Sequence, residues 1–480
     1  MNSEGLTYEN LVVAAEAAPG TSPSFELVVV PLLWQWKSPL GEFRADILGN
    51  ALRRVDAQES SAVFLQLVAD ALSLARTGEQ YAMALDGLHT AVAGVQFEQL
   101  VAAPMVVRRL AAALGQAAAA ANDHGRICEA VLALLDRLTP MMRADCGSKN
   151  KSKSKGKGLR AWQGEVLCSG MDSGVRLTPL HVECLKQCLL SRRRDLYERA
   201  AAAVVVPRFD SLGTMVAQRA RALMEYNLYA GMVCVGTGDV ARAARLWTAV
   251  FALPSKHASA IHVAAYKRLT LAELELSGRR VRLPACFAPT HARTVESHAA
   301  GYVALGDAFA ARTLAPAVAK LTDMRAVLDT DGNRGLAARV MQAAPAHFVR
   351  RVGRAYARVS VGRLVELTGF SAHPMAAGGD PCARLAQYIS EMADPTVALV
   401  AADPAAPPRD MVVHFTDPAA TAAAALAPAE RTRREELWAT RMADKVRETD
   451  ELRARLDGID RHLALTREHV LSLRNQPTAA

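Results

Sequence analysis

The sequence predicts a mostly α protein: an antiparallel helical-repeat (TPR-like) array, then a winged-helix module, then a C-terminal bundle helix. Alanine is abundant and aromatic residues make up only 5% of the 480 residues, a composition typical of helical proteins. Apolar residues recur at helical spacing through most of the chain, and turn-forming residues separate these runs. Between residues 331 and 415 the pattern changes to three helical segments followed by two β-branched stretches.

The length of the chain allows roughly two to four structural units. We predict N-terminal helical repeats at 1–147, a Lys- and Ser-rich linker at 148–158, a helical-repeat array at 159–330, a winged helix at 331–417 and a coiled-coil or bundle helix at 428–475. No apolar run is long enough to cross a bilayer, so we expect no membrane partner. Residues 1–10 carry two acids and no base, which is unlike a secretory or mitochondrial presequence.

The formal net charge of +9 is concentrated in the predicted linker. Five lysines alternate there with small polar residues, and without them the charge would be +4: Lys149, Lys151, Lys153, Lys155 and Lys157. A stretch without apolar residues gains nothing from burial and is expected to be a solvated insertion. A nuclear-import signal or a polyanion contact is the alternative that such a lysine run allows.

The eight cysteines are scattered and form no CxxC pair, which predicts a reduced, intracellular protein. Cys184 and Cys188 are one helical turn apart and could suit a metal. No His or Cys pair lies nearby in the sequence to complete four ligands, so we expect them to pack in the core.

Helical hairpins account for most of the chain before residue 330. Residues 105–138 predict two helices around a turn at 122–125, and residues 177–197 predict one helix opened by Thr178 and Pro179. Residues 226–251 predict two helices around the turn Gly236-Thr-Gly-Asp239. The next helix carries an apolar stripe from Ile261 to Leu276 and ends at Gly278.

The turn at Gly236 also resembles a dinucleotide fingerprint, because residues 232–241 can be aligned with a strand entering GxGxxA. The residues before it show no strand alternation, and Val240, Ala243 and Trp247 follow helical spacing. No acid stands about twenty residues downstream, where a ribose would need one. We therefore predict a left-handed turn and an N-cap between two antiparallel helices.

The segment from residue 331 begins with a turn that resembles the start of a calcium loop. Asp329, Asp331 and Gly332 match the start of such a loop. Its twelfth position, counted from Asp329, would be Val340, which is not an acid, so the resemblance fails. A helix at 336–356, interrupted near Pro345, is expected next. Ser360 then caps a short helix at 361–368.

A third helix, opened by Asp380 and Pro381, precedes the two β-branched stretches at 396–400 and 411–415, which predict a wing hairpin. In many winged helices this third helix reads nucleic acid. Here residues 380–394 offer Arg384 as the sole base against three acids, and phosphate binding depends on several basic contacts. We therefore predict that this module contacts protein and binds no specific nucleic acid.

The tail from residue 428 carries a heptad pattern. Positions with alternating spacings of four and three form a seam, in which Lys445, Thr449 and Thr466 are the polar members. The apolar members are Trp438, Met442, Leu452, Leu456, Ile459, Leu463, Val470 and Leu473. Arg, Glu and Asp crowd the other faces, a pattern typical of a coiled-coil or bundle helix. Such a helix gains stability only by packing this seam against another surface.

The sequence contains no motif of a known catalytic or cofactor site. HExxH, GxSxG and GxxxxGK[ST] are all absent, and the twelve histidines include no HxH pair. We predict a protein that is not an enzyme, with no catalytic residue, no cofactor and no metal.

A family resemblance rests on short stretches spread over residues 176–465. They lie at 177–182, 188–190, 226–254, 264–267, 276–278, 331–336, 388–392, 413–417 and 449–460. Together with the order of elements, they resemble the PCI domain shared by subunits of the proteasome lid, the signalosome and initiation factors. In finer detail they are similar to the subunit 3 family of the COP-9 signalosome.

This resemblance implies a non-catalytic scaffold subunit of the complex that removes a ubiquitin-like modifier from cullins, a complex whose zinc-dependent isopeptidase lies on another subunit. It implies other signalosome subunits (PCI and metalloprotease-fold) as partners, cullin-RING ligases as indirect partners, and a place in cytoplasm and nucleus. An unpaired strand edge at 411–415 and the helical seam would then bind partners. The candidate residues are Met411, Val413, Phe415, Trp438, Met442, Leu452, Leu456, Ile459, Leu463 and Val470.

Two alternatives remain at this stage. One is a PCI scaffold subunit of the proteasome lid or of an initiation-factor complex. The other is a winged-helix protein that binds nucleic acid.

Overall fold

The structure is a computed structural model. It describes residues 7–18, 25–36, 44–147, 168–170, 176–205, 207–208, 217–392, 394, 396–400, 407–416 and 428–464. The predicted linker at 148–158 lies outside these residues. The chain divides into two compact units, Met1–His347 and Phe348–Ala480. The domain boundaries drawn from the sequence stay a prediction.

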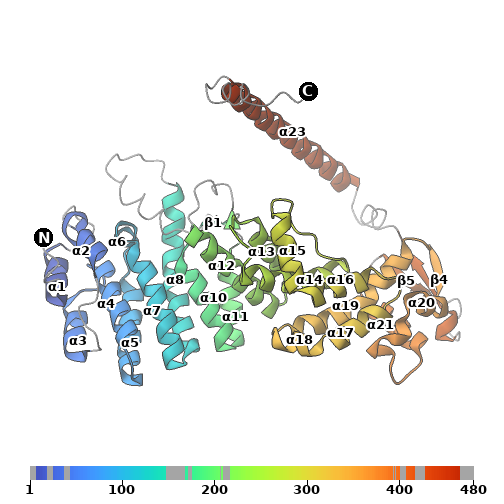
Figure 1. Ribbon diagram of the computed structural model, residues 1–480, viewed down its shortest axis with the longest axis horizontal. Coiled ribbons are helices and arrows are strands. Elements are labelled where there is room, and N and C mark those ends of the chain that lie inside the picture. The colour runs from blue at the N-terminus through green and yellow to red at the C-terminus, as the bar shows by residue number, and fades with distance from the viewer. Residues whose placement is uncertain are drawn as a thin grey trace, which may run out of the picture. The chain divides into compact units, whose positions relative to one another are not determined.

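The first unit is a succession of packed helices, which Figure 1 shows in chain order from blue to yellow. Its first half contains α1 (Tyr8–Ala17), the π-helix η1 (Phe25–Val29), α2 (Val30–Gln35), α3 (Ala45–Arg54), α4 (Ser61–Leu74), α5 (Gly78–Gly94), α6 (Phe97–Ala102), α7 (Met105–Ala121) and α8 (His124–Gly147). Helix α4 packs against both α5 and α7. It is buried almost all round, which explains its nearly continuous run of apolar residues.

The second half of this unit continues the same arrangement. It contains α10 (Pro179–Ser191), α11 (Arg194–Ala203), α12 (Ala217–Gly236), α13 (Val240–Ala252), α14 (Ala260–Ser277), α15 (Pro289–His298), α16 (Ala300–Ala310), α17 (Ala315–Asp323), α18 (Arg325–Thr330) and the larger part of α19 (Arg334–Gly353). Helix α10 packs on α8 and α12, and α13 packs on α12 and α14. Three short antiparallel strands, absent from the prediction, accompany them: β1 (Cys168–Gly170), β2 (Arg176–Leu177) and β3 (Pro207–Arg208), in the order β2-β1-β3.

The predicted hairpin turns are confirmed. Asn122 ends α7 in the left-handed conformation with φ 52°. Gly238 takes φ 93° before Asp239, whose carboxylate accepts a hydrogen bond from the Arg242 backbone N–H at 2.9 Å and caps α13. Residues 232–236 are helical, so no strand enters this glycine-rich turn and the dinucleotide interpretation is excluded.

Two helix predictions were wrong in detail. The helix predicted at 177–197 is two helices, α10 and α11, because Arg192 adopts the left-handed conformation with φ 54° and ends the first. The predicted interruption at Pro345 does not occur, since α19 runs through it. Its packing within the fold outweighs the missing hydrogen bond of one proline.

Histidines begin two of these helices in an unexpected way. In α10 the Thr178 backbone N–H donates to Nδ1 of His181 at 3.1 Å, and in α14 the Ser259 N–H donates to Nδ1 of His262 at 3.1 Å. Both pairs form capping boxes in which histidine replaces the usual Glu or Gln. Burial lowers the pKa of each imidazole to about 4, so each ring is neutral near pH 7 and able to accept the bond.

One buried carboxylate joins the first helices of the chain. Asp70 accepts hydrogen bonds from the Tyr8 hydroxyl at 3.0 Å, the Trp36 indole N–H at 2.8 Å and the Gln66 amide at 2.9 Å. Burial raises the pKa of Asp70 in spite of these donors. The network fixes α1 and the end of α2 against α4.

The second unit contains a small C-terminal module and one long helix. The module comprises the end of α19, β4 (Arg358–Ser360), α20 (Val361–Thr368), the 3₁₀ turns η3 (Phe370–Ala372) and η4 (Pro374–Ala376), α21 (Pro381–Glu391), β5 (Val397–Val400), the 3₁₀ turn η5 (Pro408–Asp410) and β6 (Val412–Phe415). Its antiparallel sheet has the order β4-β6-β5. Helix α23 (Pro428–Ala464) follows as a single helix of 37 residues.

Candidate partner-binding surfaces

The C-terminal module has an apolar core between its helices and its sheet. Helix α20 contacts α21 and β4, and α21 contacts β5. Leu364, Leu385, Ile389 and Val413 are buried there. Ser360 caps α20 by accepting a hydrogen bond from the Arg363 backbone N–H, as its position before the apolar repeat predicted.

The strand predicted to offer an unpaired edge does not have one. Strand β6 is central, with Val413 opposite Val359 of β4 on one side and opposite Leu399 of β5 on the other. The prediction was wrong because β4 was missed: it is only three residues long and buries one apolar side chain. Within the described residues, β4 and β5 are the edge strands of this sheet.

The three candidate residues on or beside β6 serve the module itself. Val413 is fully buried. The Met411 carbonyl accepts a hydrogen bond from the Val361 N–H at 2.8 Å, and the Phe415 N–H donates to the Ala357 carbonyl at 2.9 Å. Their role as partner contacts stays a prediction, and the edge of β5, where Val400 is 43% exposed, lies in a more accessible position.

Helix α21 is the third helix that the sequence predicted for this module. Asp380 caps it by accepting hydrogen bonds from the backbone N–H groups of Cys382 and Ala383. The helix ends at Glu391, earlier than predicted, and Asp394 beyond it binds Arg350 at 2.5 Å. Arg384 is therefore the only base on α21, and the expectation of weak phosphate binding is retained.

Helix α23 presents its apolar seam to solvent. Four seam side chains that the structure describes are more than half exposed: Trp438 (60%), Met442 (61%), Leu452 (53%) and Leu456 (60%). Ile459 and Leu463 lie on the same helix, their side chains outside the described set, and Val470 lies outside the described residues. Leu437 and Val446, also exposed, widen the apolar surface beyond the predicted seam.

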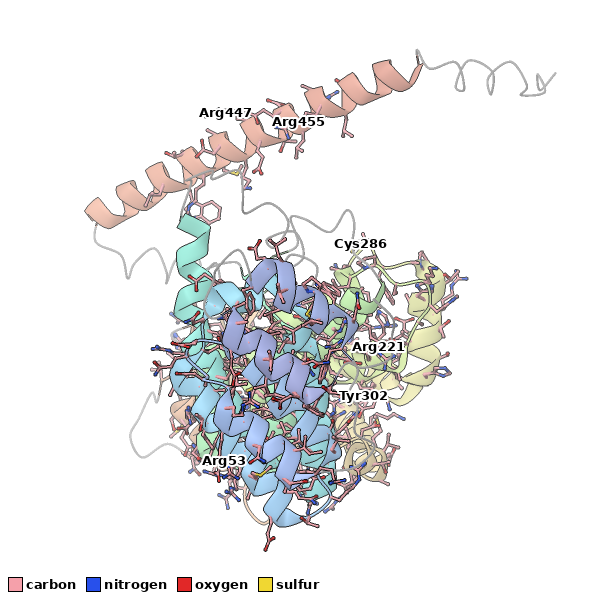
Figure 2. The ribbon with its side chains drawn as sticks, turned by 90° about the vertical axis from the view of Figure 1, so that its left-hand side faces the viewer. Arg53, Arg221, Cys286, Tyr302, Arg447 and Arg455 are labelled. Carbon is pink, nitrogen blue, oxygen red and sulfur yellow. The ribbon has the colours of Figure 1, made fainter. Side chains whose placement is uncertain are left out.

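Charged side chains occupy the remaining faces of α23, as Figure 2 shows for Arg447 and Arg455. Pairs one turn apart, such as Arg447 with Asp444 at 3.7 Å, support the helix locally. Full burial of a large apolar side chain stabilises by roughly 1.5–3 kcal/mol, and α23 has several in one row. A surface that covered this row would therefore stabilise the helix.

A second set of polar contacts lies within the array, at the turn between α18 and α19. Asp331 accepts hydrogen bonds from Lys267 Nζ at 2.7 and 2.9 Å and from the Tyr302 hydroxyl at 2.8 Å. Asn333 donates to the same Tyr302 oxygen at 3.0 Å. Partial burial favours a higher pKa for Asp331, but the bonds from Lys267 and Tyr302 outweigh it and hold the pKa below 3.8.

The cysteines at the α8–α10 contact are buried. The Cys128 thiol lies 3.7 Å from the Cys184 carbonyl oxygen, and Cys184 and Cys188 are also buried. Hydrogen bonding to Cys184 and burial raise the pKa of Cys128. Among the residues that the structure describes, no group of three or more His, Cys, Asp or Glu side chains could hold a metal. No described helix combines the length and apolarity needed to span a membrane.

The fold defines the class of the chain: it is a helical-repeat protein that also carries small antiparallel sheets and an exposed amphipathic helix. More particularly, the family described as "COP9 signalosome complex subunit 3, N-terminal helical repeats" matches residues 166–290, which include α10 to α14. The resemblance to this family is confirmed over residues 166–290. No curated protein matches the chain.

Proposed function

We propose that the chain is a non-catalytic scaffold subunit of the COP-9 signalosome, the complex that removes a ubiquitin-like modifier from cullin-RING ligases. The exposed seam of α23 carries this proposal. Trp438, Met442, Leu452 and Leu456 form one apolar row at heptad spacing, and a row of this length is stable in water only when a partner covers it. The family of residues 166–290 supports the identity of the complex.

The C-terminal module supplies the second proposed contact. Its order of elements, α19-β4-α20-α21-β5-β6, is that of a winged helix, and a PCI domain joins such a module to helical repeats. Edge strands pair readily with strands of other chains. We place this contact at β5 or β4, since β6 has no free edge.

The proposed partners are the other PCI and metalloprotease-fold subunits, with cullin-RING ligases contacted indirectly through the assembled particle. The isopeptidase reaction would take place on another subunit, and the chain would be found in cytoplasm and nucleus. This chain contributes surfaces, and its own polar clusters, such as Asp331 with Lys267 and Tyr302, hold helices together.

Purification of the tagged full-length chain from its own cells, with mass spectrometry of the stoichiometric partners, tests the proposal. We expect the remaining signalosome subunits in a particle many times larger than 51.4 kDa. Recovery of proteasome-lid or initiation-factor subunits at equal stoichiometry would instead establish the alternative PCI assembly. A solitary, monodisperse chain would refute a scaffold role of either kind.

A further inference from the structure

A pocket of about 420 Å³ lies in the second half of the array, between α14, α15 and the turn that joins α18 to α19. Lys267 and Arg268 of α14, His298 at the end of α15 and Asp331 line it, together with the first residues of α14. Three of these side chains are basic or can become cationic, and one is acidic. The pocket belongs to neither partner surface described above.

The lysine and the aspartate of this pocket satisfy each other. Lys267 gives Asp331 two hydrogen bonds, at 2.7 and 2.9 Å, and Tyr302 gives it a third. The side chains of Lys267 and Asp331 are 19% and 20% exposed, so this pair is largely withdrawn from water. The remaining positive charge of the pocket therefore comes from Arg268.

Arg268 is poorly satisfied for a cation at this depth. Its one hydrogen bond within the described residues runs from Nη1 to the Ala264 carbonyl oxygen of its own helix, at 3.1 Å. A guanidinium carries five N–H donors in a planar fork. Burial lowers the pKa of Arg268, and the neighbouring Tyr302 and Asp331 only partly oppose this. A desolvated fork that faces a pocket with most of its donors unused is a site for an anion.

We propose that this pocket binds a phosphate group, held chiefly by the guanidinium of Arg268. Phosphate oxygens match the arginine fork in pairs, and the third N–H of Lys267 is available for another oxygen. The pocket is larger than inorganic phosphate requires, so the group would be attached to an organic body. That body is either a phosphorylated side chain or a small phosphate-bearing molecule. The inference is independent of the scaffold role.

Titration calorimetry on the full-length chain tests the proposal with three probes: pyrophosphate, a phosphoserine-containing tripeptide and succinate. Lys149, Lys151, Lys153, Lys155 and Lys157 are changed to Ser in every protein used, so that the linker does not bind phosphate. We expect saturable binding of at least one phosphate probe, with succinate at least tenfold weaker. Preference for the tripeptide or for pyrophosphate then distinguishes the two sources.

Arg268→Gln should weaken binding of the preferred probe at least tenfold. The matched surface change Arg245→Gln on α13 should leave the affinity for that probe unchanged. Ala264→Glu provides a second variant, which places a carboxylate one helical turn before Arg268. We expect it to fold, because opposite charges one turn apart support a helix. This internal carboxylate should occupy the guanidinium and abolish binding. The proposal would be overturned if neither phosphate probe showed saturable binding, or if succinate bound as tightly as the phosphate probes. Unchanged binding in Ala264→Glu would also overturn it.

Discussion

At Asp331 a single carboxylate holds together α14, α16 and the turn that starts α19. Its partners Lys267 and Tyr302 come from separate helices, and Lys267 is 64 residues away in the chain. A charge that is partly buried is costly unless it is paired, and this one is paired on both oxygens. The residue that suggested a calcium loop in the sequence is a junction within the array.

Asp331→Asn should destabilise the first unit by about 1–3 kcal/mol at pH 7, because it removes the negative charge that pairs with Lys267 and accepts the Tyr302 hydrogen bond. Chemical denaturation followed by circular dichroism measures the loss. The matched change Asp329→Asn removes a long, exposed pair with Arg334 at 3.8 Å and should have little effect.

The difference in stability between wild type and Asp331→Asn should depend on pH in one direction. Since the pKa of folded Asp331 lies below 3.8, its stabilisation is fully present above the unfolded pKa. It is lost as the pH falls through the folded value. The gap between wild type and Asp331→Asn should therefore narrow below about pH 3.8, and a constant gap down to pH 2.5 would contradict the ion-pair explanation.

The capping histidines predict a second loss of stability in acid, caused by protonation of a buried neutral group. His181 and His262 have pKa values near 4 in the fold, below the ordinary 6.5, so the unfolded chain binds protons first. Stability should fall as the pH drops from about 6.5 towards 4. His181→Gln keeps a capping acceptor without a titrating group, and its melting temperature should vary less over this range. The exposed His257→Gln serves as the control and should retain the wild-type profile.

Among the elements, α23 differs from well-packed helices of the array. Helices such as α4 and α13 bury their apolar faces against neighbours, whereas the seam of α23 is exposed along its described length. The same heptad spacing that makes the helix amphipathic fixes which side a partner covers.

Leu452→Asp combined with Leu456→Asp should release the chain from its complex and leave the array folded. Two carboxylates would have to be buried in the seam, at a cost of several kcal/mol. Size-exclusion chromatography of the purified particle measures the release, and circular dichroism checks the fold. Arg447→Asp with Ala454→Asp places the same two residues on the opposite face and should assemble normally. If both double variants assembled, α23 would not be the anchor.

For the whole molecule, the distribution of positive charge favours the scaffold role over nucleic-acid binding. The net charge of +9 depends on five lysines at 149–157, and α21 offers Arg384 alone. We expect only weak, salt-sensitive binding to duplex DNA, of the non-specific kind that depends on phosphate contacts. Fluorescence anisotropy should show that changing the five lysines to Ser removes it. Duplex binding that survives this change would favour a winged-helix nucleic-acid protein.

Much of the architecture was predictable because it depends on local patterning. A helix needs only an apolar period, a cap and a stop, and Asp239, Gly278 and Ser360 supply caps and stops at the positions where the structure has them. The amphipathic tail could be predicted for the same reason. Its candidate seam residues could be listed from spacing alone, and their role in partner binding stays a prediction.

Local patterning was enough to predict a helical array with an amphipathic tail, since the apolar period and the turn residues of each helix lie within a few positions of each other. The tertiary structure was needed to show that β6 is central. Strand β4 is too short to be recognised from its sequence, and the order of strands depends on pairing between residues far apart in the chain. It also decided that Lys267 meets Asp331 and leaves Arg268 facing a pocket. Contacts between residues far apart in the chain are set by how the helices stack, and no local spacing encodes that.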